Sequence, residues 1–152
     1  MTTPHDVPKD ELEDALWQGA KGLYPAEAAV LLLTHHDHWL HSRSLRHYMV
    51  LSDSRATPGI DRRMAWVKWA EVLAELDGGD RDTPEETWIG GSGSEIRMLR
   101  LCCSLGDADC KVALEDAVSG MGEGNVRLVM SAIGHASRGF DNPTPLPWPV
   151  RP

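Results

Sequence analysis

The segment from Thr34 to His41 holds the densest group of side chains that could do chemistry, with four histidines and one aspartate in eight residues. Side chains three or four positions apart converge on one face of a helix, which is how helices present metal ligands. Asp37 and His38 share this spacing with His41 and would complete a set of two histidines and one carboxylate, the kind that holds iron or zinc. A polar helix face with ordinary surface histidines would give the same sequence pattern. Metal binding, by a binding protein or a metal-dependent enzyme, is therefore an alternative hypothesis.

His36 differs from its neighbours because it falls within an apolar stripe. At about 100° per residue, it shares a helix face with Leu32, Leu33, Trp39 and Leu40. A histidine in such a place is most often a core residue whose ring nitrogens are hydrogen-bonded. His135 is the second candidate of this buried polar kind. The sequence marks no nucleophile or carboxylate as a partner of either ring, so it names no catalytic residue.

The three cysteines and the glycine-rich loop each have a structural interpretation. An odd number of cysteines, two of them adjacent at Cys102 and Cys103, opposes a disulfide framework and favours a reducing compartment, which is the cytoplasm. The chain lacks a C-x-x-C pair, so packed thiols are expected rather than a zinc set. Residues 90–95 lack the order of a phosphate-binding P-loop and predict a capping loop before a helix. The sequence thus leaves any cofactor unknown.

Two tryptophans and two arginines are candidate contact residues. Trp88 and Trp148 lie in surroundings rich in proline and glycine, where exposed tryptophans often anchor partners. Arg43 and Arg46 belong to residues 34–63, which carry five arginines against three aspartates although the whole chain has a net charge of −8. An acidic body repels phosphate, so nucleic acid is not the expected partner. A helix-turn-helix regulator of DNA built from residues 93–138 is an alternative.

The elements that must position these residues are mostly helices. The composition, 41% hydrophobic and 25% charged, is ordinary for a globular protein, and the chain has no apolar run of about 18 residues that would predict a membrane span. We expect an all-α, single compact domain of five to seven short helices over residues 10–138, with room for one small extended segment near Trp66. Residues 1–9 are expected to form a flexible lead and residues 139–152 a proline-rich tail, with Trp148 as its anchor. The predicted helices cover residues 9–21, 24–41, 44–51, 64–76, 93–105, 110–118 and 124–138, with a loop at 52–61.

The last predicted helix has an apolar stripe, made of Val126, Val129, Met130, Ile133 and Ala136. A stripe of this spacing is typical of a helix that packs one face against a core.

Several segments carry a resemblance to known sequences: residues 32–40, 92–101, 116–125 and 132–136. Over residues 24–138 the chain resembles a set of small uncharacterised proteins from actinobacteria and their phages. The shared pattern has a histidine at the His36 position and a tryptophan-leucine pair at Trp39 and Leu40, whereas His35, His38 and His41 depart from it. The resemblance implies a coherent fold and a cytoplasmic setting, and it carries no activity.

These observations favour a non-enzymatic function. The chain lacks catalytic and nucleotide-binding motifs, and it combines an acidic body with tryptophans expected at the surface. We therefore interpret it as a small cytoplasmic protein-protein interaction or regulatory protein. Its expected partner is another protein or a second copy of itself, with no role for a membrane.

Overall fold

The computed structural model describes residues 2–52, 63–79, 82, 84–141 and 148. The described chain is mostly helical with one two-stranded sheet, which confirms the predicted fold class. Its α-helices are α1 (Lys9–Ala20), α2 (Tyr24–His36), α3 (Arg43–Arg46), α4 (Trp69–Leu76), α5 (Gly93–Gly106), α6 (Leu114–Val118) and α7 (Glu123–Arg138). Short 3-10 helices are η1 (Trp39–His41), η3 (Glu85–Thr87) and η4 (Gly139–Asp141).

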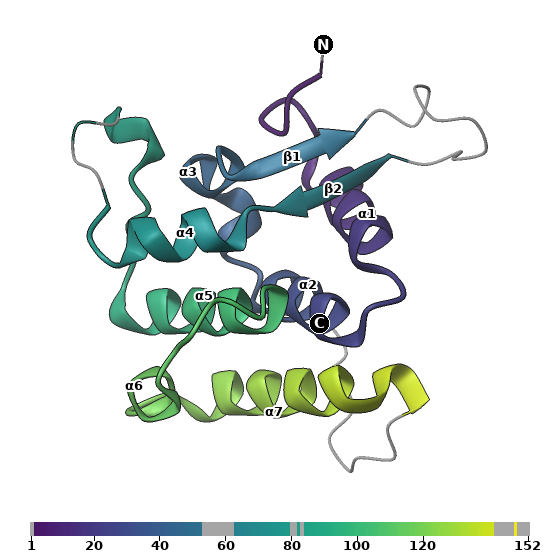
Figure 1. The fold of residues 1–152 in the computed structure, drawn as a ribbon, viewed down its shortest axis with the longest axis vertical. Coiled ribbons are helices and arrows are strands. Elements are labelled where there is room, and N and C mark those ends of the chain that lie inside the picture. The colour runs from purple at the N-terminus through teal and green to yellow at the C-terminus, as the bar shows by residue number, and fades with distance from the viewer. Residues whose placement is uncertain (1, 53–62, 80–81, 83, 142–147, 149–152) are drawn as a thin grey trace.

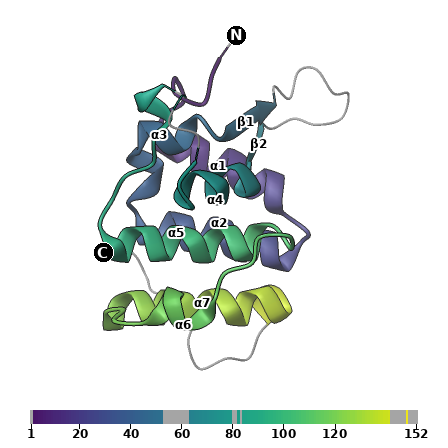
Figure 2. The same cartoon turned by 60° about the vertical axis from the view of Figure 1, so that its left-hand side comes forward.

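The helices are stacked in layers around α2. Figures 1 and 2 show α7 and α6 as an outer layer, α5 and α2 above them, and α1, α4 and the sheet on the far side. Helix α2 packs against α1, α5 and α7. This central position explains why its apolar residues extend around the helix rather than forming one stripe. Its fully buried residues include Ala28, Ala29, Leu32 and Leu33.

Helix α2 is shorter than predicted. Pro25 lies in its first turn, as the sequence indicates, but the helix ends at His36 rather than at residue 41. Asp37 adopts the left-handed conformation at φ 54° and its N–H donates to the Thr34 carbonyl. The chain then turns so that Trp39 and Leu40 become fully buried in η1. Packing of these two side chains therefore overrides the helical periodicity of the segment.

The predicted helix over residues 44–51 is wrong in its second half. Helix α3 ends at Arg46, and the chain continues as strand β1 (Met49–Ser52), which pairs antiparallel with β2 (Met64–Val67). The first three residues of β1 are Met49, Val50 and Leu51, and these large or β-branched apolar side chains fit a half-buried sheet surface. Strand β2 confirms the extended segment expected near Trp66. Most of the loop predicted at 52–61 lies outside the described residues.

The C-terminal half follows the prediction more closely. Helix α7 spans nearly the predicted residues, whereas α6 begins only at Leu114 and leaves the buried Cys110 outside the helix. Of the proline-rich tail, Trp148 and residues 139–141 are described, and positions 142–147 and 149–152 lie outside the described part. None of the described helices is long and apolar enough to cross a membrane.

The N-terminal residues contact the body of the protein. Val7 is 3% exposed, and the Arg46 guanidinium donates to the carbonyls of Pro4 and Val7 at 2.9 and 2.7 Å. The same guanidinium donates twice to the Leu40 carbonyl, at 3.1 and 2.9 Å. Arg46 thus joins the lead to the turn after α2. The flexibility expected of residues 1–9 stays a prediction.

Candidate functional site

Only two of the three proposed metal ligands, Asp37 and His41, come close to each other. Helix α2 ends at His36, so His38 does not share a helical face with them. The His38 ring contacts Glu95 instead, with Nε2 and Oε2 3.0 Å apart. The Asp37 carboxylate forms an ion pair with Lys9, and the same carboxylate lies 3.5 Å from the His41 Nε2. No group of three or more histidine, cysteine, aspartate or glutamate side chains among the described residues could hold a metal ion. The helical arrangement on which the metal hypothesis rests is therefore not formed, and metal binding by these residues stays a prediction.

His36 lies at the edge of the core rather than in its middle. The side chain is half-buried, and its Nδ1 is shielded from solvent without a hydrogen-bond partner in the described part of the chain. Burial, and next the neighbouring His38 ring at 6.1 Å, lower the pKa of His36. The ring is therefore held in its neutral form. Its position at the edge of the core fits the packing role that the sequence predicts.

His135 is a fully buried polar residue, and its partner is Glu27. The His135 Nε2 lies 2.9 Å from the Glu27 Oε1, and the two side chains are 3% and 7% exposed. The other oxygen of Glu27 accepts from the Gly22 N–H at 2.9 Å. The rings of Tyr24 and Phe140 pack against His135 at right angles. Both carboxylate oxygens are occupied and the pair is closed to solvent, so it joins α2 to α7 and offers no access to a substrate.

Sequence reasoning did not identify Glu27. The residue lies in the first turn of α2, where an acidic side chain is ordinarily explained by the helix dipole. Its partner follows 108 positions later. No local pattern links two residues across that separation, so only the three-dimensional packing of α2 on α7 reveals the pair.

The candidate contact residues are less accessible than the sequence indicated. Trp148 is half-buried and stacks on the His35 ring, with centroids 4.8 Å apart. Trp88 is also half-buried. Arg46 directs its donors to backbone carbonyls, as described above, whereas Arg43 is exposed. Only Arg43 of these four therefore presents its side chain largely to solvent.

An exposed apolar row runs along α7. Val126, Met130 and Ile133 are 36%, 49% and 55% exposed. Their spacing of four and three residues places them in one line on the outer side of the helix. Ala132 and His135 are buried on the inner side of the helix, and Val129 is buried beside the row. The predicted apolar stripe is therefore split: part of it packs inward, and three large side chains face outward.

The residues on the outer face of α7 can be compared with those of a DNA-recognition helix, which the helix-turn-helix alternative requires. Helices α5, α6 and α7 occupy residues 93–138. The outer side of α7 presents Val126, Met130 and Ile133 where a recognition helix would carry donors and acceptors for base edges. The helix-turn-helix alternative remains untested, and these side chains do not support it.

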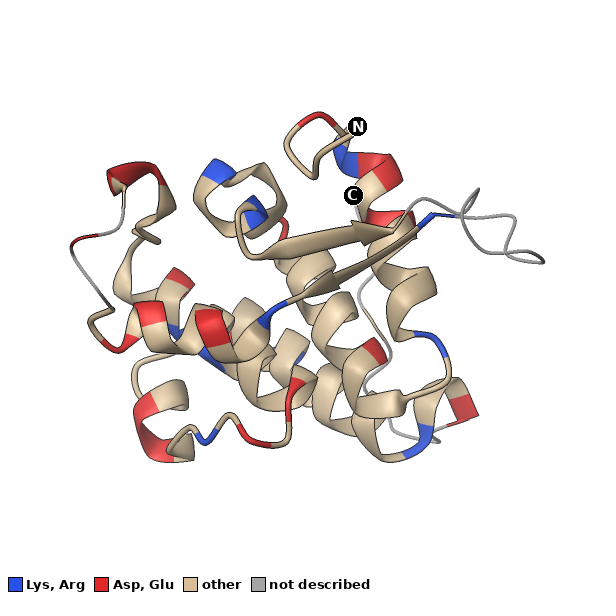
Figure 3. Cartoon of the chain, turned by 45° about the horizontal axis from the view of Figure 1, so that its top comes forward, with Lys and Arg blue, Asp and Glu red and all other residues tan. Residues whose placement is uncertain are grey.

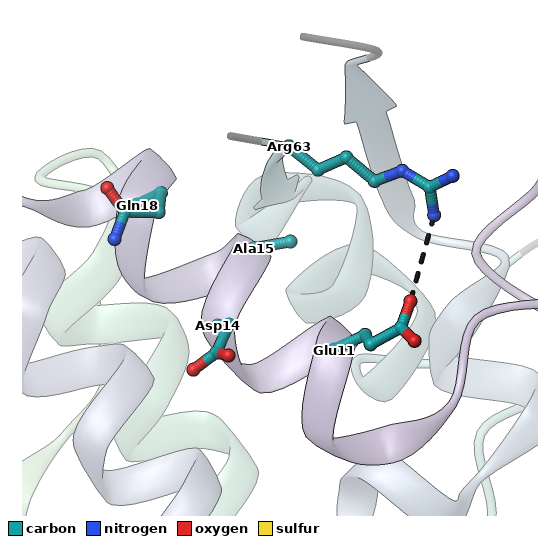
Figure 4. Close-up of a pocket in the computed structure, with 5 residues that line it drawn as sticks. All are labelled: Glu11, Asp14, Ala15, Gln18 and Arg63. Carbon is teal, nitrogen blue, oxygen red and sulfur yellow. Dashed lines mark ion pairs between the residues drawn. The ribbon is translucent and has the colours of Figure 1, made fainter. Parts of the chain in front are cut away.

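A polar hollow of about 400 Å³ lies on the outer side of α1. Figure 4 shows that Glu11, Asp14 and Gln18 line it from the helix, and that Arg63 reaches across from the start of β2. Glu11 pairs with Arg63 at 3.9 Å, whereas Asp14 points away from both. The two carboxylates do not converge, so the hollow does not form a paired acid-base site.

No family model, curated protein or solved structure matches this chain. The resemblance to small actinobacterial and phage proteins stays a prediction based on the residues that carry it. The assignment of function therefore depends on the described side chains themselves.

Proposed function

We propose that this protein is a non-enzymatic interaction protein that associates with a second copy of itself through the outer face of α7. The observation that carries the proposal is the exposed row of Val126, Met130 and Ile133. Exposed apolar side chains in isolation are ordinary, but an aligned row on an outer helix is typical of an interaction site. Helix α7 lies at the edge of the stacked helices (Figure 2), and the three side chains of the row keep about a third to a half of their surface exposed.

The charges of α7 favour a second copy as the occupant. The chain has a net charge of −8, and acidic positions are distributed over the body in Figure 3. The helix itself carries one acidic residue, Glu123, against two basic residues, Arg127 and Arg138. Two acidic copies therefore repel each other least where their α7 helices meet.

The order of charged and apolar residues along α7 favours an antiparallel arrangement of the two α7 helices in the dimer. Glu123 begins the helix and Arg138 ends it, with the apolar row between them. Both the apolar row and the charged ends are centred next to Met130. A two-fold axis through Met130 would place Glu123 of one copy near Arg138 of the other, and Val126 near Ile133. Such an interface is self-complementary, as a symmetric dimer requires.

The size of this face predicts moderate affinity. One helix of 16 residues is about 24 Å long, and a surface of that extent falls at the small end of specific interfaces. We therefore expect a dimer with a micromolar rather than nanomolar dissociation constant.

Sedimentation velocity over a range of protein concentrations tests the proposal. Wild-type protein is expected to shift from monomer to dimer as its concentration rises. Met130→Glu places two like charges next to the axis and should weaken the dimer at least tenfold, equivalent to about 1.4 kcal/mol. Ala70→Glu, at an exposed site on α4, is the matched control and should leave the dimer unchanged. Monomeric wild-type protein at every concentration would contradict the proposal.

A further inference from the structure

An apolar cavity of about 240 Å³ lies on the opposite side of α2 from α7 and is independent of the proposed dimer. It is formed where α1, α2 and β2 meet the start of α4 and the end of α5. Its lining residues are Leu16, Gly19, Ala20, Leu23, Ala26, Val30, Ala65, Trp66, Val67, Trp69 and Gly106.

Two tryptophans and two glycines shape this cavity. Trp69 lies directly against Gly106, because a Cβ there would overlap its indole ring. Gly19 allows α1 to approach β2 equally closely, since a Cβ there would overlap the Ala65 carbonyl oxygen. The Trp66 Nε1 donates to the Gly19 carbonyl at 3.1 Å. Both indoles are therefore held in place as walls by contacts of their own.

The chemistry of the walls selects an uncharged ligand. Every residue that lines the cavity is apolar or glycine, so the lining holds no charged side chain to compensate a charged ligand for its lost hydration. The Trp66 N–H is already occupied by Gly19. Two indole rings among the walls favour an aromatic ligand, because aromatic pairs gain stabilisation beyond the area they bury.

The volume of the cavity and its opening to solvent would allow a small molecule to enter and bind. An apolar cavity of about 150 Å³ in another protein binds benzene, so 240 Å³ accommodates a substituted benzene or a compact two-ring molecule. The mouth is open to solvent, since Leu23 is 68% exposed and Trp66 is 41% exposed. Val50, the cross-strand partner of Trp66, is 43% exposed beside it.

From these observations we propose that the cavity between Trp66 and Trp69 is a binding site for a small uncharged aromatic molecule. The class of ligand follows from the two indole walls, the absence of charge among the described lining residues, and the volume.

Toluene is the probe that tests this site, and benzoate is its charged counterpart. Toluene is expected to raise the Tm of the full-length protein by about 2–4 °C, as for a ligand that stabilises a domain of this size by mass action. Benzoate at the same concentration should leave the Tm unchanged. In a ¹H–¹⁵N spectrum, toluene should shift the indole signals of Trp66 and Trp69 and leave that of Trp88 in place.

A variant whose new side chain fills the cavity, compared with the same substitution at an exposed site, tests whether toluene binds there. Ala26 lines the cavity and is half-buried, so Ala26→Leu should occupy the site and abolish both responses to toluene. Ala70→Leu adds the same side chain at an exposed position outside the cavity and should retain both responses. The proposal is overturned if wild-type protein shows neither response up to the solubility of toluene, or if Ala26→Leu responds as wild type does. The spectrum of wild-type protein decides the question even if Ala26→Leu fails to fold.

Discussion

At the scale of single residues, the buried pair of Glu27 and His135 is the strongest polar contact between α2 and α7. Its atoms lie 2.9 Å apart and are shielded from solvent. Removing one member of such a pair leaves a buried group without compensation, which costs more than the pair contributes when intact. We therefore infer that this pair fixes the orientation of α7 against α2, and so determines which face of α7 is exposed.

Replacing His135 should be strongly destabilising. We expect His135→Ala to lower the free energy of unfolding by about 3–5 kcal/mol, because Glu27 would remain buried without its partner. Glu27→Gln keeps an acceptor for His135 and should cost less. Glu71→Ala, which removes an exposed pair with Lys68, should cost less than about 1 kcal/mol. Urea unfolding measures all three. Equal losses for His135→Ala and Glu71→Ala would show that the buried pair is not structurally important.

At the scale of elements, the contact between α1 and β2 depends on a glycine. Gly19→Ala should lower the free energy of unfolding by about 1–3 kcal/mol, because the new methyl group would overlap the Ala65 carbonyl oxygen. Gly124 in α7 has open space around it, so Gly124→Ala should stabilise the protein by about 0.5–1 kcal/mol through helix propensity. Thermal or urea unfolding of the two variants checks the opposite signs. A loss of stability in both would indicate that helix α7, too, is closely packed at its start.

Some of the helices and strands are predictable from local sequence, and others are not. Local signals predicted α1, α5 and α7 well, since each has an apolar pattern and α5 also begins at a capping serine, Ser92. The end of α2 at Asp37 was not predictable from the sequence, because burial of Trp39 and Leu40 by distant residues decides it. The same cause explains β1, whose pairing partner β2 follows only after an intervening loop.

The candidate site was less predictable than the fold. The histidine spacing predicted a metal set, but after the turn at Asp37 the His38 ring contacts Glu95 instead of the other two residues. The row on α7 was visible as an apolar stripe, but periodicity alone does not tell which part of a wide stripe faces the core. His135 and Ala132 take the inner side, and Met130 is left outside. Long-range packing therefore settles the orientation.

At the scale of the whole molecule, we propose that two copies of this acidic, mostly helical protein associate through α7. Its native cysteines do not interfere with a test by cross-linking. Cys102 and Cys103 are buried, and burial raises the pKa of both thiols, that of Cys103 to about 12. Cys110 is also buried, with its pKa raised for the same reason. At neutral pH these thiols remain protonated and react slowly. An added surface cysteine is then the reactive thiol of the folded chain.

Disulfide cross-linking of Met130→Cys tests the central claim most directly. A two-fold axis next to Met130 would bring the two copies of this position within the Cα separation of about 7 Å that a disulfide allows. Mild oxidation should therefore convert Met130→Cys to a covalent dimer. Ser137→Cys lies on the same exposed side, but in an antiparallel pair its two copies would be about 20 Å apart, so it should stay monomeric. Failure of Met130→Cys to cross-link, or equal cross-linking of both variants, would contradict the antiparallel dimer through α7.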